Sequence, residues 1–137
     1  MIIGIGTDIC DIRRIEQIIE RHGKRFLNRT FSKTEQAYCE TKARPAMSYA
    51  KRFAAKEAVA KALGGANTGS LSWKSVDVKN DPSGRPVAVL KDDAEVRANL
   101  LCPENHSLNI HLSLSDDYPY ATAFAIAEAT PVATQSV

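Results

Sequence analysis

The sequence predicts a single α+β domain in which a largely antiparallel sheet packs against one long central helix. Its 137 residues suit one domain with an ordinary core. An apolar strand and helical patterns fill the first half, whereas the second half holds alternating strand patterns joined by turns. We expect the domain to cover residues 1–128 and residues 129–137 to form a C-terminal tail.

The chain opens with a strand and a helix. Residues 2–9 alternate apolar residues with small ones and predict a buried strand. Asp11 is a preferred N-cap type for the next helix, and Gly23 is a suitable residue to end it. The isoleucines at helical spacing are Ile12, Ile15, Ile18 and Ile19.

Two more helices are expected before the second half. Ser32 and Glu35 have the spacing of a capping box, which predicts a helix over 32–42. Pro45 suits the first turn of a longer helix that runs to Leu63 and ends at two glycines. Small residues give this long helix a narrow face that can pack very close to a neighbour. That face consists of Ala50, Phe53, Ala54, Ala58 and Ala62.

Turn residues and alternation divide the second half into two hairpins with a helix between them. The expected elements are strands at 75–79 and 86–90 around a turn at 80–84, a helix at 92–101, and strands at 107–115 and 120–127 around a turn at 116–119.

The composition, 44% hydrophobic and 25% charged, is that of a soluble globular protein. A net charge of +2 gives no argument for nucleic acid, although basic residues gather between Arg13 and Lys61. The apolar residues at the start are too few to span a membrane and lack a basic flank and a cleavage site. Three widely spaced cysteines without a C-x-x-C motif argue against disulfides and zinc. We expect a cytoplasmic protein that binds neither membrane nor nucleic acid.

The first candidate site combines two carboxylates and a lysine. Glu57 and Lys61 are four residues apart and leave the long helix on one face, while Asp8 ends a short apolar strand. Carboxylates are hard oxygen ligands for Mg²⁺, and a lysine is a point charge for phosphate oxygens. The alternative is ordinary: a Glu–Lys pair at this spacing stabilises many surface helices, and an isolated aspartate commonly caps a helix.

Gly4 and Gly6 resemble the start of a dinucleotide-binding loop, but the third glycine would fall at Ile9 and no repeated β-α-β order follows. We therefore expect these glycines to let the strand lie against another backbone or a ligand.

Arg14, Gln17 and Arg21 form a stripe along one face of the first helix. Such a stripe is either a solvated surface or a docking strip for an acidic partner, since arginine pairs specifically with carboxylates.

On a later strand, alternation places His111, Ser113 and Ser115 on one sheet face. That face is either solvent-exposed or a ligand-facing wall. A Ser/His/Asp triad is not expected, because no G-x-S-x-G motif is present.

Several segments match a known family in order and spacing over roughly residues 1–128. They are Gly4-Ile5-Gly6-Thr7-Asp8-Ile9, Arg52 to Ala58, Lys61 to Gly64, Asn80 with Gly84-Arg85-Pro86, and His111 to Ser115 before Tyr120-Ala121. With these segments the chain resembles the holo-acyl-carrier-protein synthases, the small bacterial members of the 4′-phosphopantetheinyl transferase superfamily. The sequence departs from many relatives at Asp116-Asp117, where they have histidine, and we assign no role there.

The resemblance implies that coenzyme A donates its phosphopantetheine arm to a serine of apo acyl carrier protein, in support of fatty acid biosynthesis. Adenosine 3′,5′-bisphosphate would be released. Asp8 and Glu57 match the family's Mg²⁺ ligands, and Lys61 matches a lysine on the pyrophosphate. Removal of the serine proton is left open between a metal-site carboxylate, this lysine and a bound water.

The resemblance also implies binding residues and an assembly. Arg52 and His111, with Arg44, match positions near the 3′-phosphate of coenzyme A. The remaining coenzyme A positions are Gly64, and Asn80, Gly84 and Pro86 in the loop beside the adenine. The helix with Arg14, Gln17 and Arg21 matches the docking surface for acyl carrier protein. Relatives of this size are homotrimers with active sites between subunits.

Three other functions compete with the transferase. A coenzyme A-binding module without catalysis would lack a metal ligand, yet Asp8, Glu57 and Lys61 are all present. An RNA-binding domain would expose aromatic residues among basic ones, whereas Phe53 is at a core position and Trp73 is isolated in the sequence. A transferase for carrier domains of large synthases is the third; the short chain favours a free carrier protein, by analogy only.

Overall fold

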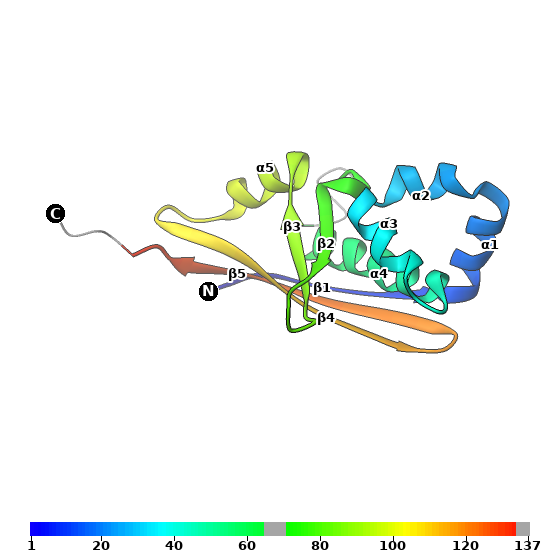
Figure 1. The fold of residues 1–137 in the computed structure, drawn as a ribbon. Helices are drawn as coiled ribbons and strands as arrows, with labels where there is room; N and C mark the ends of the chain where they lie inside the picture. The colour runs from blue at the N-terminus through cyan, green and yellow to red at the C-terminus, as the bar shows by residue number, and fades with distance from the viewer. Residues whose placement is uncertain (65–70, 134–137) are drawn as a thin grey trace.

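The computed structural model describes residues 1–64 and 71–133 of the chain. Figure 1 shows how the sheets and the other helices are arranged around the long helix α4. The elements are β1 (Ile2–Asp11), α1 (Ile12–His22), α2 (Lys24–Thr30), α3 (Lys33–Glu40), α4 (Pro45–Ala62), the 3₁₀ turn η2 (Trp73–Ser75), β2 (Val76–Asn80), β3 (Pro86–Leu90), α5 (Asp92–Leu101), β4 (His106–Asp117) and β5 (Tyr120–Pro131).

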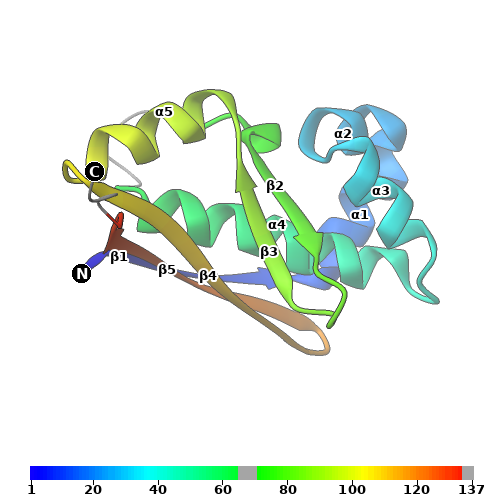
Figure 2. The same ribbon diagram turned by 60° about the vertical axis from the view of Figure 1, so that its left-hand side comes forward.

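Both sheets are antiparallel, which confirms the predicted fold class. The larger sheet has the order β1-β5-β4, and β2 and β3 form a separate hairpin. Helix α4 lies along one face of the larger sheet (Figures 1 and 2). In this register Asp8 of β1 is opposite Ala123 of β5, and His111 of β4 is opposite Ile126.

The two glycines of β1 allow α4 to approach the sheet unusually closely. A Cβ atom on Gly4 would lie 1.9 Å from the carbonyl oxygen of Ala62, and one on Gly6 would lie 1.8 Å from that of Ala58. No side chain fits at such distances, so the expected contact between this strand and another backbone is confirmed. The predicted small-residue face of the helix forms the other side of the contact.

The expectation that β1 is buried is wrong for one of its faces. Its helix-facing residues contact α4, but Ile5 and Ile9 on the other face are 59% and 64% exposed. Phe124 of the neighbouring strand β5 is also 44% exposed. An apolar run in a sequence shows that a strand forms but does not show that both of its faces are covered within the same chain.

The ends of the predicted helices agree with the structure. Asp11 caps α1 by accepting a hydrogen bond from the backbone N–H of Arg13, and Gly23 ends this helix with φ of 53°. Ser32 and Glu35 form both hydrogen bonds of the capping box at α3. The sequence reading missed α2, a short helix with little apolar periodicity. Strand β5 continues to Pro131, so the expected tail begins inside a strand.

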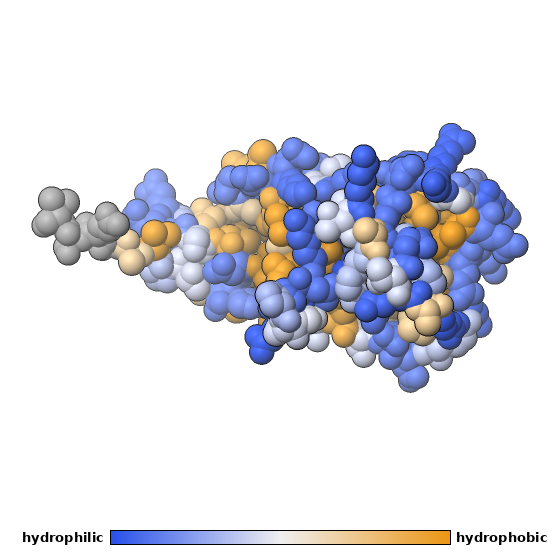
Figure 3. Space-filling view, viewed as in Figure 1, coloured by the Kyte–Doolittle hydropathy of each residue, from blue (hydrophilic) through white to orange (hydrophobic). Residues whose placement is uncertain are grey.

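Figure 3 shows one face of the molecule, which is largely hydrophilic, with hydrophobic atoms gathered around β3 and α5. The exposed apolar residues of these two elements include Val87, Val96 and Leu100. Within residues 1–64 and 71–133, no helix is both long enough and apolar enough to cross a membrane.

Candidate active site

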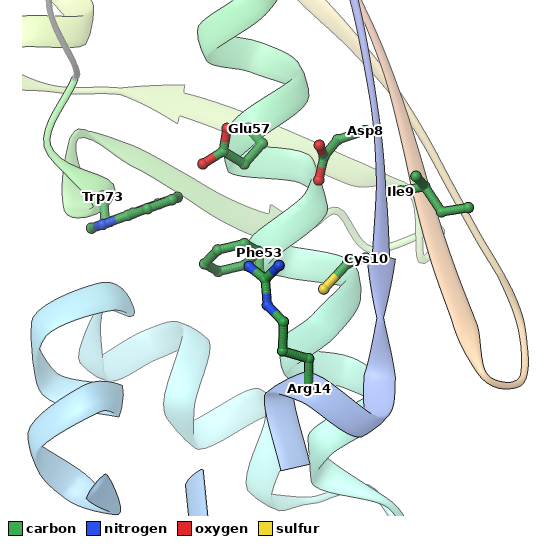
Figure 4. Close-up of a pocket in the computed structure, with 7 residues that line it drawn as sticks. All are labelled: Asp8, Ile9, Cys10, Arg14, Phe53, Glu57 and Trp73. Atoms are coloured by element: carbon green, nitrogen blue, oxygen red, sulfur yellow. The ribbon is translucent and has the colours of Figure 1, made fainter. Parts of the chain in front are cut away.

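A pocket of about 380 Å³ lies between β1, α1, α4 and η2 (Figure 4). It is lined by Asp8, Ile9, Cys10, Arg14, Phe53, Glu57 and Trp73. Two of the three residues of the predicted carboxylate–lysine site, Asp8 and Glu57, therefore meet in one cavity although they are far apart in the sequence.

The local structure explains how these side chains meet. Asp8 follows Gly4 and Gly6 on the helix-facing side of β1, whereas Figure 4 shows the side chain of Ile9 on the opposite side of the strand. Phe53 and Glu57 are one helical turn apart on α4, so both leave this helix on the face that borders the pocket. The close contact of strand and helix brings the two carboxylates to the same cavity.

Lys61 connects the helix to the strand beside this pocket. Its ammonium group donates a hydrogen bond of 2.9 Å to the backbone carbonyl of Thr7 and lies 3.4 Å from Oδ1 of Asp8. The lysine four residues after Glu57 thus contacts the carboxylate of the strand. A plain surface pair within one helix does not account for this contact.

Electrostatics favour a cation at the two carboxylates. Burial raises the pKa of Glu57 above its ordinary value, and the charge of Asp8 raises it further. Lys61 and Arg14 oppose this shift in the pKa. Added positive charge nearby would therefore stabilise the ionised form of Glu57.

Cys10 also lines the pocket but is not suited to act as a nucleophile, because burial raises the pKa of its thiol to about 11.

Arg52 is a buried cation on α4 without a carboxylate partner among the described residues. Its Nη2 atom donates to Oδ1 of Asn80 at 2.6 Å, and its guanidinium lies 4.0 Å from the ring centroid of Tyr38. Its buried Nε atom has no hydrogen-bond partner in the described structure. A buried arginine paired only with neutral groups retains capacity to bind an anion.

The predicted adenine loop lies beside this arginine. Asn80 ends β2, contacts Arg52 through its side-chain oxygen, and donates from Nδ2 to the carbonyl of Gly84 at 3.0 Å. Gly84 has φ of 90° in the turn, and Pro86 begins β3. Gly64 follows the end of α4 with φ of 98°. Residues 65–67, which follow Gly64, lie outside the described residues.

The structure does not bring Arg44 and His111 to the pocket of this chain. Arg44 is 3.7 Å from a carboxylate oxygen of Glu16, and its guanidinium lies over the ring of Tyr118. His111 is on the sheet face that points away from α4, where Nε2 lies 3.0 Å from Oε1 of Glu128. Asp116, the first residue of the Asp116-Asp117 departure from the family, forms an ion pair of 2.9 Å with Lys51.

The predicted docking strip is exposed and begins at the pocket. Arg14, Gln17 and Arg21 all lie on the solvent-exposed side of α1. Arg14 also lines the cavity, and Figure 4 shows its side chain extending toward it from α1. A partner bound along this strip would therefore have part of its surface at the mouth of the pocket.

Two aromatic pocket residues were given no functional role by sequence reasoning. The sequence places Phe53 at a core position and Trp73 apart from other aromatic residues, but their rings stack with centroids 4.8 Å apart and line the cavity. The position of Phe53 one turn before Glu57 was an available signal. Trp73 gave no such signal, because only the fold brings it to α4.

The sequence is similar to that of a known enzyme family over nearly its whole length. The family model described as 4′-phosphopantetheinyl transferase superfamily matches residues 4–123. Holo-[acyl-carrier-protein] synthase of Agrobacterium fabrum is 49% identical over 132 residues, which cover 96% of this chain and 98% of that protein. The protein of the same name from Mesorhizobium japonicum is 51% identical, with 96% of each chain covered.

Solved structures gave the same result. The crystal structure of holo-[acyl-carrier-protein] synthase from Neisseria meningitidis has a TM-score of 0.78 at 34% identity and covers 93% of this chain and 99% of that one. The Helicobacter pylori enzyme in complex with coenzyme A has a TM-score of 0.74 at 30% identity, with 90% and 99% covered.

Proposed function

The chain belongs to the 4′-phosphopantetheinyl transferase superfamily, and from its pocket we propose how its residues carry out the family reaction. It is an enzyme that transfers the 4′-phosphopantetheine group of coenzyme A to a serine of apo acyl carrier protein. The product carrier serves fatty acid biosynthesis. The observation that carries the proposed mechanism is the meeting of Asp8 and Glu57 in one cavity with basic residues at its edge.

Asp8 and Glu57 would hold Mg²⁺. The donor set fits this ion, because Mg²⁺ is commonly bound by one or two carboxylates and fills its remaining positions with water and substrate phosphates. When bound, the ion supplies charge stabilisation to the phosphate that is transferred.

Lys61 would neutralise negative charge on the pyrophosphate of coenzyme A. Its side chain is half exposed, so the ammonium group can turn from Asp8 toward a bound phosphate. Phosphoryl transfer is catalysed mainly by positioning and by charge neutralisation, which is what a lysine at this edge provides. The group that takes the serine proton remains one of the metal-site carboxylates, Lys61 or a bound water.

Arg52 would bind the 3′-phosphate of coenzyme A. Its burial without a carboxylate partner in the described structure, and its unpaired Nε atom, support an anionic ligand at this position. The loop with Asn80, Gly84 and Pro86 adjoins this arginine and would lie beside the adenine.

The strip of Arg14, Gln17 and Arg21 would bind an acidic surface of acyl carrier protein. Exposure of all three side chains and the position of Arg14 at the pocket support this assignment. A carrier bound there would place its serine near the carboxylates.

Two observations support active sites shared between subunits of a homotrimer. His111, expected at the 3′-phosphate, is on the sheet face opposite to Asp8, so the two side chains cannot serve one pocket within a single chain. The same outer face exposes Ile5, Ile9 and Phe124, which is typical of a surface covered by another copy. His111 would then complete the site of a neighbouring subunit, and Arg44 is assigned to the same shared site.

The bacterial relatives and the three free cysteines are consistent with a cytoplasmic enzyme.

Intact-mass spectrometry tests the reaction directly. The purified chain is incubated with apo acyl carrier protein, coenzyme A and Mg²⁺, and a parallel sample contains EDTA. We expect the carrier to gain the mass of one phosphopantetheine arm only in the sample without EDTA. Coenzyme A binding without any gain in mass would instead indicate a binding module or a different carrier.

A further inference from the structure

Lys56 is a buried cation that precedes the proposed metal ligand Glu57 in the sequence, and the mechanism above does not use it. Only 2% of the residue is exposed. Its ammonium group contacts three oxygen atoms. They are Oε1 of Glu35 at 2.9 Å, the carbonyl oxygen of Trp73 at 2.9 Å and the carbonyl oxygen of Val76 at 2.5 Å.

These contacts join four elements at one buried point. Glu35 on α3 uses the same carboxylate to accept hydrogen bonds from the backbone N–H groups of Ser32 and Val78. Lys56 on α4 thereby links the start of α3, the turn η2 and the strand β2. Every polar atom of the ammonium and the carboxylate has a partner suited to its charge, as a buried ion pair requires.

The contact with Trp73 reaches the pocket. The carbonyl of Trp73 is held by Lys56, and its ring stacks on Phe53 at an interplanar angle of 27°. Both rings line the cavity that contains Asp8 and Glu57. Since Phe53, Lys56 and Glu57 all belong to α4, the hydrogen bond fixes η2 relative to the helix that carries a proposed metal ligand.

We propose that Lys56 is a positioning residue of the active site: it holds the backbone of Trp73 so that the Phe53–Trp73 stack forms the fixed aromatic wall of the substrate pocket. This inference rests on the proposed function, because it takes the pocket to be the site where coenzyme A binds. The competing explanation is that Lys56 only neutralises Glu35 and stabilises the fold. The two explanations predict different environments for the Trp73 ring in a folded variant that lacks the charges of Lys56 and Glu35.

The test uses the full chain with both charges of the buried pair removed, as the double variant Lys56→Met with Glu35→Gln. Removing both partners avoids leaving one buried charge alone, and glutamine keeps an acceptor for the capping box. Lys74→Met is the matched control, because Lys74 is an exposed lysine directly after the same tryptophan. Trp73 is the only tryptophan of the chain, so its fluorescence reports on this wall alone.

We expect the double variant to fold and to show red-shifted emission of Trp73 with stronger acrylamide quenching. Its KM for coenzyme A should rise ~10-fold or more, because a small misplacement of substrate-positioning groups can lower an enzyme's efficiency up to ~100-fold. The KM for the carrier should change far less, and Lys74→Met should match the unaltered chain. A folded double variant with unchanged emission and unchanged KM for coenzyme A would overturn the proposal.

A second variant covers the case in which the double variant fails to fold. Lys56→Arg keeps a cation for Glu35 but replaces the ammonium with a planar guanidinium, which cannot reproduce the same three contacts. It should alter Trp73 emission and the KM for coenzyme A, and normal values of both would overturn the proposal. If the unaltered chain transfers no phosphopantetheine, the proposed function fails, whereas the fluorescence comparison still tests whether Lys56 holds Trp73.

Discussion

Lys61 of α4 and Asp8 of β1 form an ion pair of 3.4 Å across the contact between helix and strand, and the same ammonium group donates to the carbonyl of Thr7. The side chain of Asp8 is 18% exposed, whereas that of Lys61 is 50% exposed. Glu57 faces the same cavity with a raised pKa. The site therefore combines negative charge at its base with a movable positive charge at its edge.

The two carboxylates should be indispensable for transfer. We expect Asp8→Ala and Glu57→Ala each to lower the transfer rate by at least ~100-fold, because a metal site contributes several kcal/mol of charge stabilisation. Calorimetric titration with Mg²⁺ in the presence of coenzyme A should show weakened metal binding in both variants. Circular dichroism should show an intact fold. A normal rate in either variant would contradict the assignment of metal ligands.

Arg21 should affect binding of the carrier protein without affecting coenzyme A. Arg21→Glu reverses a charge on the exposed strip but outside the pocket, so we expect the KM for acyl carrier protein to rise ~10-fold or more while the KM for coenzyme A stays within about twofold. Arg14→Glu should raise the KM for the carrier and also lower kcat, since Arg14 lines the cavity. Lys33→Glu, an exposed change on α3, serves as the control. Equal effects on both substrates would argue against a docking strip.

Mixing variants should test the shared active site. Asp8→Ala and His111→Ala alter opposite faces of the sheet, so each should be inactive or impaired alone. If His111 completes the pocket of a neighbouring subunit, mixed oligomers contain some sites with both native residues, and activity should partly return. A mixture of Asp8→Ala and Glu57→Ala is the matched control, because both changes affect the same pocket. Failure of the first mixture to exceed the second, after confirmed subunit exchange, would show that sites are not shared.

Gly6→Ala should strongly destabilise the fold. The new Cβ atom would lie 1.8 Å from the carbonyl oxygen of Ala58, and the backbone on both sides would have to separate. We expect the free energy of unfolding to fall by about 3 kcal/mol or more, as for severe overpacking. Gly84→Ala is the comparison, because it meets no neighbour within 4 Å and should cost only about 1–2 kcal/mol through its positive φ. Denaturant titration of both variants measures the difference.

Asp77 should contribute to stability at neutral pH and lose that contribution in acid. Burial opposes its charge, but hydrogen bonds from Lys91 and Ser32 outweigh this effect and hold its pKa below the ordinary value of 3.8. The folded state therefore binds its proton less readily than the unfolded chain does. The contribution is complete above the unfolded pKa and disappears as the pH falls through the folded pKa.

We expect Asp77→Asn to be less stable than the unaltered chain at pH 7 and to lose less additional stability below pH ~4. Thermal unfolding of both proteins between neutral and acid pH measures this. Parallel loss of stability in the two proteins would show that other carboxylates determine the acid limb.

Much of the fold could be predicted because local signals and global packing agree. The capping box of Ser32 and Glu35, the proline at the start of α4 and the turn before Pro86 each specify an element end by local chemistry. Helix α2 could not be predicted, because its buried residues are too few to produce a period. The exposed face of β1 was missed because an apolar run does not identify what covers it.

The site could be predicted in part. Asp8 and Glu57 were recognisable from residue type and spacing, and the structure brings them to one cavity. The stacking of Trp73 on Phe53 depends on how a distant turn crosses α4, and no local pattern contains this information. The family resemblance places Arg44 near the 3′-phosphate, and no local pattern predicts that its side chain lies beside Glu16 and Tyr118 of its own chain.

Alanines at alternate positions of β5, from Ala121 to Ala129, are all buried, and this strand packs against α4. Together with Gly4 and Gly6 they set the height of the helix above the sheet. Because Asp8 belongs to the sheet and Glu57 to the helix, this interlayer spacing also sets the separation of the two carboxylates. A larger residue such as valine at Ala125 should widen the proposed metal site from within the core, without touching Asp8 or Glu57, and so change its selectivity between ions. Engineering the preference between cations of different radius could thus begin at positions that no substrate ever contacts.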